Sequence, residues 1–111
     1  MGTRILIVNL DALGTVLATT AQLPAIKRAY PNSHITWITR GNALPLLQNN
    51  PLIDHLVEWN DENRMTILQQ HFEIALNADK SRPAAAFMNA LHAETKRGFG
   101  LNENGAIIPL N

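Results

Sequence analysis

Strand-like and helix-like segments alternate along the chain, and this alternation limits the fold more than any other feature of the sequence. The first segment, Arg4 to Val8, is apolar and rich in β-branched residues, as in a strand buried on both faces of a parallel sheet. Apolar residues at helical spacing follow from Val16 to Tyr30, where Pro24 predicts a kink or a break. Further strands are predicted at 35–39, 55–59 and 72–76, and further helices at 44–48, 61–68 and 81–91. The pattern predicts an α/β fold, with a parallel sheet, right-handed crossovers and helices on both faces.

Single residues and one dipeptide predict where two helices begin and where a hairpin turns. Asp61 and Ser81 are expected to cap the third and fourth helices, and Pro83 suits the first turn of the latter. The dipeptide Asn104-Gly105 lies between strand-like residues at 97–101 and 106–108, which predicts a C-terminal β-hairpin. At 111 residues and 46% hydrophobic composition, the chain is expected to form one domain, 1–111, with its own core. Only 16% of residues are charged, against roughly 25% in an average soluble domain, so we expect self-association or a partner domain.

Composition also excludes several classes of protein. Basic and acidic residues are equal in number, which disfavours a nucleic-acid partner. The absence of cysteine removes disulfides, thiol nucleophiles and thiolate metal sites. No apolar run approaches the ~18 residues of a membrane span, so a cytoplasmic location is expected, with peripheral contact to the inner membrane left open. The four histidines match no metal-binding spacing, and we expect no metal and no cofactor.

Ligands of open α/β sheets bind beyond the carboxyl ends of the strands, which directs attention to the loops there. In the first loop Asp11 is either a turn residue or a general base for an attacking hydroxyl. Gly14 permits a tight turn, and Thr15 is a plausible N-cap of a helix whose free N–H groups suit an anion. The loop has one glycine and no following lysine, so a G-x-G-x-x-G dinucleotide site is weakly supported and a P-loop is excluded.

Three cations and two tryptophans are further candidates. Arg40 follows the second strand, and Lys80 and Arg82 follow the fourth; they either clamp a phosphate or carboxylate or are ordinary surface charges. Trp37 and Trp59 fall in predicted strands, which favours core packing over sugar stacking. The hydrolase motif G-x-S-x-G is absent.

Several stretches in order along the chain resemble glycosyltransferase family 9, the ADP-heptose:lipopolysaccharide heptosyltransferases and their relatives. They are RILIVNLDALG at 4–14, LATT at 17–20, LPAIKRAYP at 23–31, ITWIT at 35–39 and KRGFGL at 96–101, together with Leu46-Leu47, Asn50-Pro51 and Ile53-Asp54. The resemblance implies the Rossmann-like N-terminal half of a GT-B enzyme, which receives an anionic sugar or glycolipid acceptor. A C-terminal donor-binding domain, absent here, would hold the ADP-sugar. The implied reaction inverts the anomeric centre and needs a base but no bound metal.

The chain departs from the family pattern at the base. The family often has Asp directly after the glycine of the first loop, where this chain has Thr15, and Asp11 is the nearest replacement. The resemblance therefore predicts an acceptor domain that does not turn over alone, with Asp11 as base and Arg40, Lys80 and Arg82 as anion contacts. Two alternatives stay open: a non-catalytic Rossmann-like module for a glycolipid or nucleotide, and a scaffold fragment that binds nothing.

Overall fold

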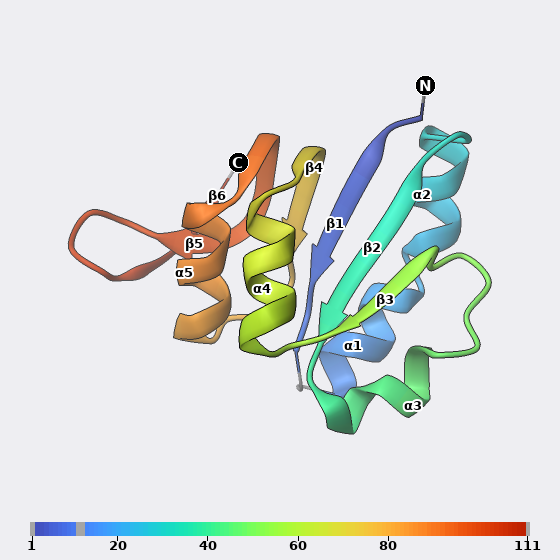
Figure 1. Cartoon of the computed structure of the whole chain (residues 1–111), viewed down its shortest axis with the longest axis horizontal. Coiled ribbons are helices and arrows are strands. Elements are labelled where there is room, and N and C mark those ends of the chain that lie inside the picture. Colours follow the sequence, from blue (N-terminus) through green and yellow to red (C-terminus); the bar gives the residue numbers. More distant parts are fainter. Residues whose placement is uncertain (1, 11–12, 111) are drawn as a thin grey trace.

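The computed structural model describes residues 2–10 and 13–110, and its strands form one sheet (Figure 1). The strand order is β3-β2-β1-β4-β5-β6, with β6 antiparallel to β5 and all other pairs parallel. The predicted α/β fold, with a mostly parallel Rossmann-like sheet, is confirmed. The strands are β1 (Arg4–Val8), β2 (His34–Thr39), β3 (His55–Glu58), β4 (His71–Asn77), β5 (His92–Leu101) and β6 (Ile107–Leu110).

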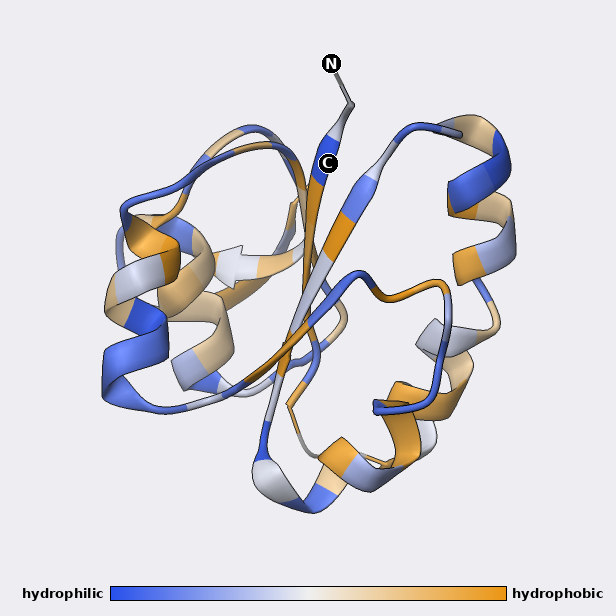
Figure 2. Cartoon of the chain, turned by 45° about the vertical axis from the view of Figure 1, so that its right-hand side comes forward, coloured by the Kyte–Doolittle hydropathy of each residue, from blue (hydrophilic) through white to orange (hydrophobic). Residues whose placement is uncertain are grey.

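Helices cover both faces of the sheet, as the alternating pattern predicted. Figure 2 shows the sheet nearly edge-on between two helical layers. One layer contains α1 to α3 and the short 3₁₀ turn η1, and the other contains α4 and α5. The helices are α1 (Leu13–Thr20), α2 (Leu23–Ala29), η1 (Gly41–Ala43), α3 (Leu44–Leu47), α4 (Asp61–Leu68) and α5 (Arg82–Ala90).

Alternate residues of β1 supply two separate cores. Ile5 and Ile7 pack with Val16 of α1, Leu23 of α2 and the fully buried Trp37. Leu6 and Val8 face the other way and pack with α4 and α5. Burial on both faces explains why β1 is an unbroken apolar run.

The first predicted helix is two helices, because the chain breaks at Ala21 and Gln22. Pro24 then lies in the first turn of α2, where its missing N–H leaves no hydrogen bond unmade. The predicted break is therefore confirmed. None of the described helices is both long and apolar enough to cross a membrane.

Of the two predicted helix caps, the structure confirms the cap of α5 and corrects the cap of α4. The Ser81 side chain accepts a hydrogen bond from the Ala84 N–H, so the predicted cap of α5 is confirmed. The expected cap Asp61 is instead the first residue of α4, and Asn60 is the cap, accepting from the Asn63 N–H at 2.7 Å. Asn60 takes this role because its extended backbone directs the side chain back over the first turn.

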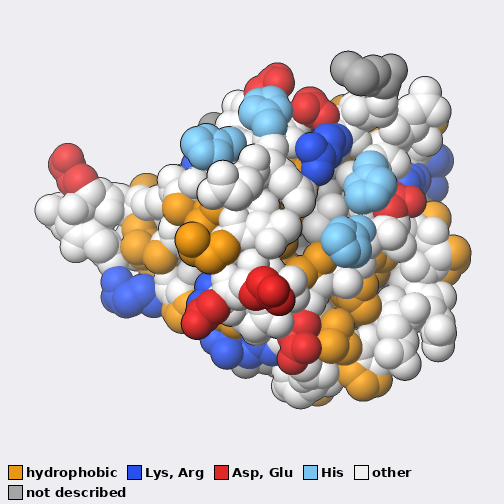
Figure 3. Space-filling view, viewed as in Figure 1, with side chains coloured by type: hydrophobic (Ala, Val, Ile, Leu, Met, Phe, Trp, Pro, Cys, Tyr) orange, Lys and Arg blue, Asp and Glu red, His pale blue; other side chains and the backbone are white. Residues whose placement is uncertain are grey.

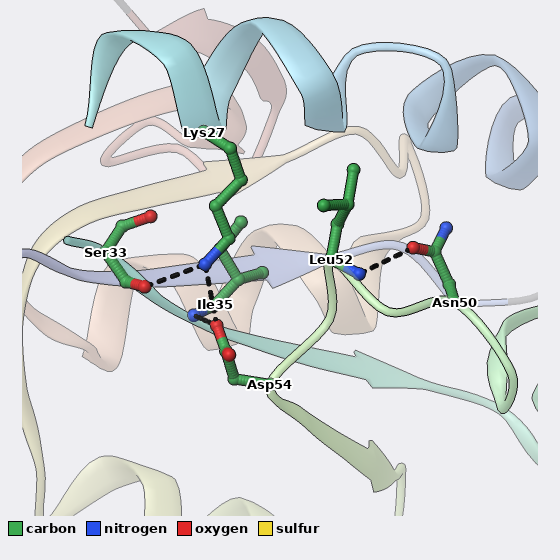
Figure 4. Close-up of polar contacts among 6 residues, drawn as sticks. All are labelled: Lys27, Ser33, Ile35, Asn50, Leu52 and Asp54. Carbon is green, nitrogen blue, oxygen red and sulfur yellow. Dashed lines mark hydrogen bonds and ion pairs between the residues drawn. The ribbon is translucent and has the colours of Figure 1, made fainter. Parts of the chain in front are cut away.

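An ion pair between Lys27 and Asp54 at the surface joins α2 to the connection before β3 (Figure 4). Lys27 Nζ lies 3.0 Å from Asp54 Oδ2 and donates to the Ser33 carbonyl at 2.8 Å. Asp54 Oδ2 also accepts the Ile35 N–H at 2.8 Å. Burial raises the pKa of Asp54, but the Ile35 hydrogen bond and the Lys27 charge outweigh it and leave the pKa lowered.

The end of the chain forms the predicted hairpin, in which Gly105 has a φ of +80°. The preceding strand β5 begins at His92, earlier than the predicted start at Arg97, because α5 ends before Leu91. Gly98 in β5 has a φ of +95°, and a Cβ there would lie 1.9 Å from the carbonyl oxygen of Asn77. Only glycine fits at this close approach of β4 and β5.

Candidate functional site at the carboxyl edge of the sheet

The strand order reverses between β1 and β4, which defines a crevice at the carboxyl ends of these strands. The chain leaves β1 toward α1 on one face and leaves β4 toward α5 on the other. The two loops therefore separate at this point. Hydrogen bonds from polar side chains hold these loops in place.

Asp79 links the two loops and is only 5% exposed. Its carboxylate accepts the Leu10 N–H from the first loop at 2.9 Å and the Ser81 N–H at 2.9 Å. Burial raises the pKa of Asp79, but the Ser81 and Leu10 hydrogen bonds and the positive charge of Arg40 outweigh it and lower the pKa. Asp79 is therefore ionised at neutral pH, and its charge is held between the crevice loops.

The first loop is also fixed from the side of β2. The Leu10 carbonyl accepts the Thr39 hydroxyl at 2.6 Å and the Arg40 N–H at 3.0 Å. Asn9 Nδ2 donates to Thr19 Oγ1 of α1 at 2.9 Å, whereas the buried Asn9 Oδ1 has no hydrogen-bond partner among the residues that the structure describes. The backbone just before Asp11 is thus held from both neighbouring strands.

A hollow of about 390 Å³ opens beside this crevice, on the α4 and α5 face. The Arg64 guanidinium lies over the Trp59 ring at 4.7 Å, and that ring meets Phe87 edge-on, with centroids 5.2 Å apart. Arg64 also forms an ion pair with Asp61. The hollow is lined by Arg40, Trp59, Arg64, Pro83, Ala86 and Phe87. Guanidinium groups beside an aromatic ring suit a ligand that carries both negative charge and a flat apolar face.

Several solved glycosyltransferase structures have a similar fold. Glycosyl transferase family 9 from Veillonella parvula DSM 2008 has a TM-score of 0.69 and 24% identity over 89% of this chain and 31% of that chain. E. coli heptosyltransferase WaaC with ADP has a TM-score of 0.74 and 18% identity over 90% of this chain and 35% of that one. E. coli ADP-heptose lps heptosyltransferase II has a TM-score of 0.67 and 15% identity over 79% and 28%. The chain has a family 9 glycosyltransferase-like fold.

The chain spans about a third of the length of these glycosyltransferases. No protein-family model matches the sequence, and no curated protein matches it, so the likeness rests on the structure. The α/β sheet with its helices is the shared part, and the expected resemblance to family 9 enzymes is confirmed at the level of the fold.

The residues that the sequence predicted for a site in the first loop do not all lie where they were expected. Asp11 lies outside the described residues. Gly14 is in α1, has no positive φ, and makes no tight turn. The expected capping role of Thr15 is wrong, because α1 already begins at Leu13 and makes Thr15 its third residue. Thr15 is exposed, and its carbonyl accepts the Thr19 hydroxyl.

The three predicted anion contacts separate into two groups. Arg40 lines the hollow and lies close enough to Asp79 to lower its pKa. Lys80 instead lies over the Phe99 ring of β5, with its Nζ 5.3 Å from the centroid, and Arg82 donates to the Gly105 carbonyl of the hairpin. The structure therefore places Arg40 with Arg64 and Trp59, and directs Lys80 and Arg82 toward β5 and β6.

Sequence reasoning overlooked Asp79, Arg64 and the exposed side of Trp59. A signal existed for Asp79, since a carboxylate two residues before the cap Ser81 and directly after a buried strand falls in the crevice. Trp59 lies one residue past β3, so it packs on the core with one side and lines the hollow with the other. Nothing in the sequence indicates that Arg64, a mid-helix residue, reaches Trp59.

Potential metal ligands within residues 2–10 and 13–110 come together at the opposite edge of the sheet, at His71, Glu73 and Glu94.

Proposed function

We propose that the chain is the acceptor-binding, N-terminal domain of an inverting GT-B glycosyltransferase. The enzyme would transfer a heptose-type sugar from an ADP-sugar to an anionic acceptor of the lipopolysaccharide-core type. The observation that carries the proposal is the hollow formed by Arg40, Trp59 and Arg64 at the carboxyl edge of a glycosyltransferase-like sheet. Its acceptor would be lipid-linked, which would bring the domain to the cytoplasmic side of the inner membrane.

The hollow fits an anionic sugar better than a nucleotide. A pyrophosphate site of the dinucleotide type needs glycines that let the backbone approach, and the first loop contains Gly14 alone. The hollow offers guanidinium groups, which bind carboxylate or phosphate with paired hydrogen bonds. The Trp59 ring lines the hollow with the Arg64 guanidinium over it, so a bound sugar would meet the indole and the positive charge together.

Asp11 is the proposed general base. It follows Leu10, whose N–H is bound by Asp79 and whose carbonyl is bound by Thr39. The carboxylate would take the proton from the acceptor hydroxyl, and the resulting oxygen nucleophile would attack the anomeric carbon from the side opposite the leaving nucleotide. Because the ADP-sugar would be held by a second domain, the 111-residue chain alone should bind acceptor without turnover.

Calorimetric titration with a phosphorylated or carboxylated core-type oligosaccharide tests the proposal. Arg64→Gln should weaken binding by about 10-fold or more, since a hydrogen bond to a charged group contributes roughly 1.5–3 kcal/mol. Arg28→Gln removes the same charge from an exposed site on α2 and should change the affinity by less than about twofold. Absence of binding, or equal losses in both variants, would contradict the proposed acceptor site.

A further inference from the structure

We propose that the N-terminal ends of β4 and β5 form a site for a divalent transition metal, best suited to Zn²⁺. The ligands are His71 and Glu73 from β4 and Glu94 from β5, and His92 pairs with His71 in the register of the two strands. This site lies at the edge of the sheet opposite the hollow described above, since parallel strands all begin at one edge and end at the other.

The same tripeptide pattern begins both strands. His71-Phe72-Glu73 opens β4 and His92-Ala93-Glu94 opens β5, and the register pairs His71 with His92 and Phe72 with Ala93. Phe72 and Ala93 both pack on the core. The histidines and glutamates alternate with these core residues and share one exposed patch, because neighbouring strands lie only about 4.8 Å apart. Figure 3 shows histidine and acidic side chains gathered where β4 and β5 begin.

The imidazole of His71 lies between the two carboxylates. Its Nδ1 is 3.6 Å from Glu73 Oε2 and its Nε2 is 3.8 Å from Glu94 Oε2, so one nitrogen must turn to face both carboxylates before a single ion can bind. One ligand atom from each of His71, Glu73 and Glu94 lies within 4.8 Å of the other two. Zinc bonds of 2.0–2.2 Å place neighbouring tetrahedral ligands about 3.3 Å apart. The side chains of His71 and Glu94 are exposed, so rotation of these two would have to close the remaining difference.

Glu73 is already oriented by the neighbouring strand. Its Oε1 accepts the Arg4 N–H of β1 at 2.5 Å, while Oε2 is the atom nearest His71. A hydrogen bond of this kind restricts a ligand carboxylate before the metal arrives, as outer-shell partners do in known metal sites. The site is therefore partly organised in the metal-free chain.

The donor set selects the kind of ion. Neutral imidazole and carboxylate donors suit Zn²⁺, whereas Mg²⁺ and Ca²⁺ prefer oxygen alone. The two carboxylates balance the charge of the ion. Without a metal, these contacts would be exposed His–Glu pairs, which contribute little to stability. With a metal, the ion would join β4 to β5 at their first residues.

The test is a calorimetric titration of the chelator-treated, tag-free chain with Zn²⁺. We expect one saturable equivalent for the wild-type chain. His71→Ala and Glu94→Gln should each weaken binding by at least about 10-fold, because each removes a ligand. His55→Ala removes an exposed histidine that begins β3 and should leave the affinity unchanged. Circular dichroism verifies that each variant folds.

Two results would overturn the proposal. One is a wild-type chain that takes up no stoichiometric Zn²⁺. The other is a loss in His55→Ala as large as the loss in His71→Ala, which would mean diffuse histidine binding. Amide NMR with Co²⁺ provides a second measurement: line broadening should centre on residues 71–73 and 92–94, and even broadening around all four histidines would also refute the site.

Discussion

Replacing Asp79 with Asn should destabilise the chain while leaving it folded. Asp79 is buried, and its carboxylate accepts two backbone N–H groups, from Leu10 and Ser81, at 2.9 Å each. Asn has the same shape but only one acceptor oxygen, so one of the two donors loses its partner and faces an NH₂ group. The substitution therefore removes both the charge and one hydrogen bond at the junction of the two crevice loops.

The expected loss follows from these contacts. Losing a charge-assisted hydrogen bond and leaving a buried donor unpaired should cost about 2–4 kcal/mol. A domain of this size is stable by roughly 5–15 kcal/mol, so Asp79→Asn should remain folded in water. Its urea midpoint should move clearly to lower concentration.

Urea unfolding followed by circular dichroism measures this change. Glu103→Gln, at an exposed position in the hairpin turn, is the control and should stay within about 0.5 kcal/mol of the wild type. A change of less than about 0.5 kcal/mol in Asp79→Asn would refute the view that the carboxylate holds the loops together.

The pH dependence gives an independent check on the same residue. Since the pKa of Asp79 is lowered in the folded chain, its contribution is complete above the ordinary aspartate pKa of about 4 and is lost as pH falls through the folded value. The wild type should therefore lose stability below about pH 4 more steeply than Asp79→Asn. Parallel profiles would contradict the lowered pKa.

Five further substitutions test other parts of the structure. Gly98→Ala should lower the free energy of unfolding by at least about 2 kcal/mol, because Gly98 has a positive φ and a Cβ there would clash with the Asn77 carbonyl. Gly14→Ala, in α1 with open space around the added Cβ, should instead stabilise the chain by up to about 1 kcal/mol. Thermal unfolding compares the two variants, and equal effects would contradict these expectations. Asp54→Asn should cost about 1–2 kcal/mol in urea unfolding, since it breaks the Lys27 pair and weakens the bond to Ile35, and no change would show the pair to be without net effect. Sedimentation at high concentration should show self-association that Leu17→Glu, on the exposed side of α1, reduces; a monomeric wild type would refute it. Joined to a donor-binding domain, Asp11→Asn should slow the chemical step by at least ~10²-fold, and a change of only a few fold in single-turnover rates would assign Asp11 to the turn.

The fold was predictable because local signals agreed with the global arrangement. The apolar run from Arg4 to Val8, the break at Pro24 and the Asn-Gly hairpin each depend on residues near in sequence. The errors are of one kind: the start of α1, the cap at Asn60 and the start of β5 are boundaries, which tertiary contacts adjust by a few residues.

The candidate site was less accessible from sequence. Its location was predicted from the rule that ligands of open α/β sheets bind beyond the carboxyl ends of the strands. Arg40 lines the hollow at this carboxyl edge. The directions of the side chains could not be predicted from the sequence. Lys80 and Arg82 contact β5 and the hairpin, whereas Arg64 of α4 contacts Trp59. The cluster of His71, Glu73 and Glu94 was not predicted, because Glu94 lies in the part of β5 before the predicted start at Arg97 and the sequence does not show how β4 and β5 pair.

The most direct test of the acceptor-domain account is an amide NMR titration of the chain with an anionic core-type oligosaccharide and, separately, with an ADP-sugar. The account predicts saturable shifts around Leu10, Arg40, Trp59 and Arg64 with the oligosaccharide and none with the ADP-sugar. Shifts with the ADP-sugar alone would contradict it and indicate a nucleotide-binding module. If neither ligand moves these resonances, the chain has no acceptor site of its own.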